Sequence, residues 1–112
     1  MHKSERQLIA LRLLAYLFKV QRSKTRKSRR EAARKARLSR TVFNCVEHWE
    51  ANKVKPELVV QAVHSLRFRG EDRDTVFREL LVVFPKLNVD SFHRVARVAN
   101  RLPCHSWGSF RR

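Results

Sequence analysis

Apolar residues recur at helical spacing in five separate segments of this 112-residue chain. The first segment, residues 8–20, is apolar nearly all round, and its one polar stripe consists of Arg12, Tyr16 and Lys19. An S-x-x-Q capping box precedes it and marks a helix start. A helix with so little polar surface must be buried or covered by a partner, and its apolar part is too short to cross a bilayer. We therefore expect residues 1–21 to form an apolar helix that packs inside the fold or against a partner.

The remaining pattern predicts four further helices within residues 41–103. Their expected bounds are Ser39 or Thr41 to Asn52, Pro56 to Gly70, Asp72 or Asp74 to Pro85, and Asn88 or Asp90 to Pro103. In the first of these helices Val42, Val46 and Trp49 share one side, which we expect to face the core. Val82 and Val83 leave a short buried strand open as an alternative. With only two glycines and three prolines, the chain is predicted to be all-α, a small bundle of about five to six helices.

Charge separates residues 22–40 from the rest of the chain. Ten of these nineteen residues are Lys or Arg, and Glu31 is the only acid among them. The formal net charge of the whole chain is +16, and the first forty residues hold fourteen of the basic residues against two acids. A polyanion is the partner that such a segment fits, because each phosphate neutralised by Lys or Arg releases a condensed counterion. A solvated, self-repelling tail is the alternative.

The basic segment also carries a helix signal. An S-x-x-E capping box at residues 28–31 predicts a helix that begins at Arg29 and reaches Leu38. On that helix, one stripe would hold Arg30, Arg34 and Arg37, and the opposite face would hold the small residues Ala32, Ala33 and Ala36. We expect a basic, Arg-rich helical arm that enters a groove of RNA or lies along its phosphates. Arginines outnumber lysines by 18 to 8, which favours bidentate phosphate contacts.

A second stripe of arginines and a short tail extend the candidate surface. The stripe lies on the last expected helix, and the tail, residues 104–112, interleaves Trp107 and Phe110 with basic residues. Aromatic rings beside arginines can stack on unpaired bases, although Trp107 could equally cap the core. The expected RNA contacts are Arg22, Lys24, Arg26, Lys27, Arg29, Arg30, Arg34, Lys35, Arg37, Arg40, Arg94, Arg97, Arg101, Arg111 and Arg112.

Two segments resemble known RNA-binding proteins. The stretch RREAARKAR, with its flanks, resembles the arginine-rich motif peptides of viral RNA-binding and antitermination proteins, which implies RNA binding without a specific base contact. The stretch LLVVFPKLNVDSF is similar to the helix-loop-helix joints of FAST-kinase-like and related organellar α-helical-repeat proteins. That second resemblance implies stacked antiparallel helix pairs with one face free for RNA or protein.

Catalytic and metal-binding patterns are weak. The sequence has no phosphate-binding glycine loop and no nucleophile elbow, so we expect no enzymatic activity. Cys45 and His48 share a helix face, and Cys104 with His105 would complete four zinc ligands. The last two are adjacent, which makes them awkward joint ligands, and no C-x-x-C pair is present. We therefore expect neither a metal nor another cofactor.

These features favour a structural or accessory RNA-binding protein of a ribonucleoprotein, with a ribosome, mitochondrial or other, as the expected setting. Neighbouring proteins would dock on the helix of residues 1–21. We expect an intracellular location, in the mitochondrion or in the nucleus and cytoplasm, and no secretion, because no signal cleavage site follows the apolar segment. One alternative is a viral nucleocapsid-type or silencing-suppressor protein that coats RNA. Another is a membrane-surface or protein-interaction module led by the first helix.

Overall fold

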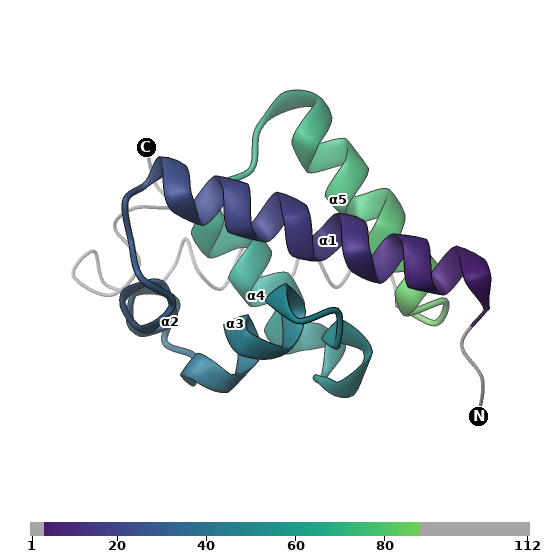
Figure 1. Cartoon of the computed structure of the whole chain (residues 1–112), viewed down its shortest axis with the longest axis horizontal. Helices are drawn as coiled ribbons and strands as arrows, with labels where there is room; N and C mark the ends of the chain where they lie inside the picture. Colours follow the sequence, from purple (N-terminus) through teal and green to yellow (C-terminus); the bar gives the residue numbers. More distant parts are fainter. Residues whose placement is uncertain (1–3, 88–112) are drawn as a thin grey trace.

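The computed structural model describes residues 4–87, and all regular structure in that range is helical (Figure 1). The elements are α1 (Glu5–Lys24), α2 (Arg29–Ala36), α3 (Arg40–Glu47), the short 3-10 helix η1 (Ala51–Lys53), α4 (Pro56–Leu66) and α5 (Gly70–Val83). The expectation of a small all-α bundle is confirmed. Val82 and Val83 close α5 and form no strand. The helix expected near residues 88–103 and the tail at residues 104–112 lie outside the described residues.

Helix α1 runs across the length of the bundle, with α5 packed along it and α3 and α4 behind and below it (Figure 1). Its N-terminus is closed by the predicted capping box, in which the Ser4 hydroxyl accepts from the Gln7 amide at 3.1 Å. The buried positions of α1 are Ala10, Leu11, Leu14, Ala15 and Phe18. Most of its apolar surface therefore belongs to the core. Among the described helices, none is long and apolar enough to cross a membrane.

Phe18 joins the bundle at its centre. Its ring lies 6.3 Å from that of Phe43 in α3 and 5.6 Å from that of Phe68 in the turn between α4 and α5, measured between centroids. All three rings are buried, and tilted pairs of this kind add to the energy of area burial. Near the start of α1, Arg6 donates two hydrogen bonds to the Glu79 carboxylate of α5, at 2.6 and 2.9 Å. The ring contact with Phe43 fixes α1 against α3, and the Arg6–Glu79 pair fixes it against α5.

Helix α2 packs through its three alanines. Ala32, Ala33 and Ala36 are each no more than 2% exposed and face α3 and α4, as their spacing predicted. Such small side chains let the helix backbone approach its neighbours closely. The side chain of Gln61 on α4 donates to the Ala36 carbonyl at 2.7 Å, which satisfies one of the unpaired carbonyls at the end of α2. The Arg-rich segment is therefore part of the bundle and shares its core.

Several helix ends differ from the sequence expectations. The chain has only two glycines, so side-chain-bearing residues take the left-handed positions that end its helices: Arg26, Arg37, Trp49 and Arg67, at φ of 55°, 59°, 65° and 58°. Helix α2 accordingly ends at Ala36 and does not reach Leu38. Three of the four residues are arginines, and a cation is favoured near the negative end of a helix dipole.

Two other expectations are corrected at these ends. The helix expected to run to Asn52 stops at Glu47, and the Glu50 amide closes it by donating to the Cys45 carbonyl at 2.8 Å. Trp49 therefore points away from the core and is 51% exposed, although we expected it to face inward. Gly70 does not end α4. It begins α5, four residues after α4 has stopped, and the expected cap at Asp72 or Asp74 falls inside that helix.

Candidate nucleic-acid interface

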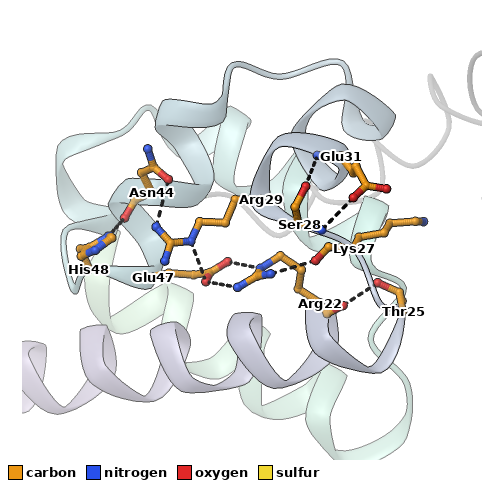
Figure 2. A network of polar contacts seen from close by, with 9 residues as sticks. All are labelled: Arg22, Thr25, Lys27, Ser28, Arg29, Glu31, Asn44, Glu47 and His48. Atoms are coloured by element: carbon orange, nitrogen blue, oxygen red, sulfur yellow. Dashed lines mark hydrogen bonds and ion pairs between the residues drawn. The ribbon is translucent and has the colours of Figure 1, made fainter.

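The basic segment divides into two groups, and the first surrounds a buried carboxylate. Glu47 on α3 has a fully buried side chain, and we call it with Arg22 and Arg29 the Glu47 cluster (Figure 2). Arg22 donates from Nε and Nη2 to the two carboxylate oxygens, each at 2.9 Å, and from Nη1 to the Lys27 carbonyl at 2.8 Å. Arg29 Nε lies 3.4 Å from the same carboxylate, and its Nη1 donates to Asn44 at 3.3 Å.

The Glu47 cluster ties the end of α1 and the start of α2 to α3. The hydrogen bond with Glu47 raises the pKa of Arg22, so this guanidinium stays charged over the whole accessible pH range. Planar bidentate pairing uses the donors that would otherwise bind a phosphate. The side chain of Arg22 is only 15% exposed. Sequence reasoning placed Arg22 and Arg29 among the RNA contacts; here both guanidinium groups pair with Glu47, and the Arg29 side chain stays 36% exposed.

The second group faces solvent. The exposed basic residues at the end of α1, in the following turn, and on and after α2 are Lys24, Arg26, Arg30, Arg34, Lys35, Arg37 and Arg40. Glu31 is the only acid in this stretch, and the structure uses it to start α2. The Ser28 amide donates to the Glu31 carboxylate at 3.3 Å and lowers the pKa of Glu31. The Ser28 hydroxyl lowers this pKa further. The resulting surface holds seven cations and one acid, Glu31, whose carboxylate accepts from the Ser28 amide in the capping box.

Beside this surface lies a hollow of about 500 Å³ that we call the basic hollow. It forms where the end of α1, the turn after it, the outer side of α2 and the turn between α4 and α5 meet. Its lining residues are Gln21, Lys24, Thr25, Lys27, Lys35, Ser65, Leu66, Arg67, Arg69 and Asp72. Five of these residues are basic and one is acidic. The cations of this concave surface therefore come from three separate stretches of the chain: residues 24–27, Lys35 and residues 67–69.

Lys27 reports the electrostatic state of the basic hollow. Its partial burial lowers its pKa to about 8, with further lowering by Lys35, an opposing effect of Glu31 and a smaller lowering by Arg67. Burial disfavours the charged form of a lysine, and a second cation close by adds to this effect. The lowered pKa of Lys27 thus reflects its burial first and the nearby Lys35 second.

Hydrogen bonds hold the walls of the basic hollow in place. The Gln21 side chain donates to the carbonyls of Leu66 and Arg67, at 2.9 and 3.4 Å, and so joins α1 to the end of α4. On the other side, the contact of Arg22 with the Lys27 carbonyl fixes the turn that carries this lysine. Sequence reasoning missed Arg67 and Arg69. Their basic character is visible in RFRG, but only the tertiary fold carries them beside α2.

Other candidate residues fall into two groups. Arg94, Arg97, Arg101, Arg111, Arg112, Cys104 and His105 lie outside the described residues. Within them, Cys45 is half-buried, and His48 Nδ1 lies 2.6 Å from the Asn44 carbonyl. Residues 4–87 contain no group of three or more His, Cys, Asp or Glu side chains that could hold a metal ion.

The outer side of α1 carries a different kind of surface. Leu8, Ile9 and Tyr16 are 40%, 51% and 64% exposed. The Arg12 guanidinium lies over the exposed ring of Trp49, 4.6 Å from its centroid. This stacking covers one face of the indole and holds Trp49 against α1. The surface is mixed, with apolar residues beside a cation.

Comparison with protein-family models, with curated proteins and with solved structures finds no match for this chain.

Proposed function

We propose that this protein is a small RNA-binding protein that serves as a structural or accessory subunit of a ribonucleoprotein. The observation that carries the proposal is the exposed surface of seven cations between residues 24 and 40, whose one acid is engaged in a capping box. A phosphate backbone carries the charge that complements this surface, and its release of counterions supplies the driving force. Mitochondrial or other ribosomes are settings that suit such a subunit.

The shape of α2 favours contacts with phosphates over contacts with base edges. The helix has only eight residues, about 12 Å at 1.5 Å each, and three of them are alanines committed to the core. The major groove of an RNA duplex is deep and narrow, so proteins recognise duplexes mainly through backbone and shape. We expect binding to depend on charge and RNA fold and only weakly on sequence.

Two alternatives remain as proposals of lower rank. An RNA-coating protein would use the same cations but would bind in proportion to RNA length. A membrane-surface module needs the apolar face of α1, and the core already buries Ala10, Leu11, Leu14, Ala15 and Phe18. The exposed residues Leu8, Ile9 and Tyr16 would instead suit contact with a neighbouring protein in the particle.

The test is the salt dependence of RNA affinity, measured by fluorescence anisotropy with a labelled RNA hairpin. If five of the seven exposed cations contact phosphates, the slope of log Kobs against log[KCl] is about −4. Replacing both Arg30 and Arg34 by Gln should make that slope shallower by about 1.5 and weaken binding similarly for unrelated sequences.

The matched control is Lys55→Gln with Lys86→Gln. It removes the same charge from exposed residues near the start of α4, where Lys86 lies with Pro56 around a separate apolar cavity. We expect a smaller loss of affinity in this control than in the α2 variant. Equal losses, or a salt slope near zero in the unmodified protein, would contradict the proposal.

A further inference from the structure

We infer that the basic hollow is a subsite for a terminal phosphate of the RNA, a phosphomonoester that can carry two negative charges. The inference rests on the proposed RNA-binding function and adds the part of the RNA that this place would hold. Its volume of about 500 Å³ lies within the range of about 300–1,000 Å³ typical of ligand pockets. It has room for a phosphate together with the sugar that bears it.

Charge is the first argument. The lining brings together Lys24, Lys27, Lys35, Arg67 and Arg69 against Asp72. The ends of α1 and α4 also meet here, and their carbonyls favour some positive charge nearby. That explains the presence of cations at the two turns. Lys24, Lys27, Lys35 and Arg69 share this lining with a single carboxylate, Asp72, and a dianion complements them better than the single charge of an internal phosphodiester.

The Lys27 ammonium is one of these cations, and it is partly buried. Its pKa is lowered to about 8 by partial burial first and by the facing Lys35 second, while Glu31 raises it and Arg67 lowers it slightly. A bound dianion would favour the charged lysine and raise that pKa again. Binding would therefore take up a proton near pH 8. Affinity for the terminal phosphate should fall as the pH rises above 8, while the phosphate itself, with a second pKa of about 6, stays doubly charged.

Position is the second argument. An RNA strand continues on both sides of an internal phosphate, whereas a terminal phosphate has the strand on one side only and can project into a concave site. Lys35 lies both in the lining of the basic hollow and on α2, next in sequence to the exposed Arg34. A strand whose end occupies the hollow can thus continue across the exposed face of α2. The described lining residues include no aromatic side chain, so we expect no preference for the terminal base.

The experiment compares three RNAs of one sequence with an internal fluorophore: one with a 5′-phosphate, one with a 3′-phosphate and one with hydroxyls at both ends. We expect at least one terminal phosphate to improve affinity about tenfold at constant salt, the size of one added charge-assisted contact. The variant with Lys27→Gln and Lys35→Gln should lose this preference. The Lys55→Gln and Lys86→Gln control should keep it, as should the variant with Arg30→Gln and Arg34→Gln, which weakens all three RNAs together.

The outcomes separate this inference from the proposed function. Equal binding of the three RNAs by the unmodified protein would overturn the terminal-phosphate subsite and leave RNA binding intact. If none of the RNAs binds, the proposed function fails, and titration with a nucleoside monophosphate decides the hollow alone. One-to-one binding that is lost in the Lys27 and Lys35 variant would then assign the site to a free phosphorylated ligand. No saturable binding would overturn the phosphate site.

Discussion

The Glu47 cluster and the basic hollow draw their cations from the same short run of sequence, yet their environments are opposite. In the cluster, Arg22 and Arg29 both pair with one buried carboxylate, that of Glu47. In the hollow, Lys27 and Lys35 meet further cations, and the pKa of Lys27 is lowered by its burial and its neighbours. Figure 2 shows how close the two regions are, because Arg22 in one holds the carbonyl of Lys27 in the other.

This difference separates cations that stabilise the fold from cations that are available to a ligand. A buried ion pair that is complete contributes to the structure, and breaking it is costly. Repulsion that is retained on a surface reduces stability, and such features concentrate at functional sites. Net charge alone cannot distinguish these two groups. The two groups are distinguished by the buried carboxylate of Glu47, which lies between the arginines of the Glu47 cluster.

The largest effect is expected from Glu47→Gln. This change leaves Arg22 partly buried without its anion, so the free energy of unfolding should fall by about 3–5 kcal/mol, measured by urea denaturation. The matched control is Glu50→Gln, which breaks the exposed contact with Lys53 and should cost at most about 1 kcal/mol. A loss no greater than that of the control would show that the Glu47 cluster does not hold the fold.

A compensating variant extends the same comparison, because Glu47→Gln alone can unfold a domain of ordinary stability. Replacing the whole cluster by Glu47→Leu, Arg22→Met and Arg29→Met removes the buried charges together and should recover most of the lost stability. RNA affinity should fall less in this variant than in the variant with Arg30→Gln and Arg34→Gln, since the guanidinium groups of Arg22 and Arg29 are engaged by Glu47. A loss of affinity as large as that from the α2 arginine variant would return Arg22 and Arg29 to the contact surface.

Local features of the sequence predicted much of this arrangement. Both capping boxes formed, since each depends on residues three positions apart. The alanine face of α2 and the residues Val42 and Val46 of α3 are buried as their spacing indicated, because one helix period decides which residues share a side. The left-handed ends at Arg37, Trp49 and Arg67 were not predicted, because the usual signal at such positions is glycine or asparagine.

The site itself required tertiary information. Glu47 lies four residues after Phe43 on the inward side of α3, and a carboxylate at such a position is a signal that a cation must reach it. The sequence does not say which of ten neighbouring cations does so. Likewise, Arg67 and Arg69 are more than thirty residues from α2 and meet Lys35 only because α4 packs on that helix.

An intermediate effect is expected from Ser28→Ala. Ser28 begins α2 between the Glu47 cluster and the basic hollow, and its hydroxyl accepts from the Glu31 amide at 3.1 Å. Loss of this cap should cost about 1 kcal/mol of unfolding free energy. Ser39→Ala is the control, because Ser39 precedes α3 without a side-chain capping bond. If the two changes cost the same, the capping box does not set the position of α2 between the two regions.

The smallest effect is expected from Lys27→Gln, and it has the opposite sign. Below pH 8 this lysine is charged in both the folded and the unfolded chain, and the folded chain opposes that charge, so its removal should raise stability, by up to about 0.5 kcal/mol. Between pH 8 and the ordinary pKa of 10.5, the unfolded chain binds more protons than the folded one. The unmodified protein therefore gains stability across this window, and the advantage of the variant disappears.

Thermal unfolding of both proteins across this pH window measures the effect, with Lys55→Gln as the exposed control. The same variant should weaken binding of an RNA that ends in a phosphate, so the change that stabilises the fold impairs the proposed site. A stability gain that persists above pH 10.5, or a loss of stability below pH 8, would mean that Lys27 is not opposed by its neighbours. The basic hollow would then resemble the Glu47 cluster, and the distinction between structural and available cations would not apply to this turn.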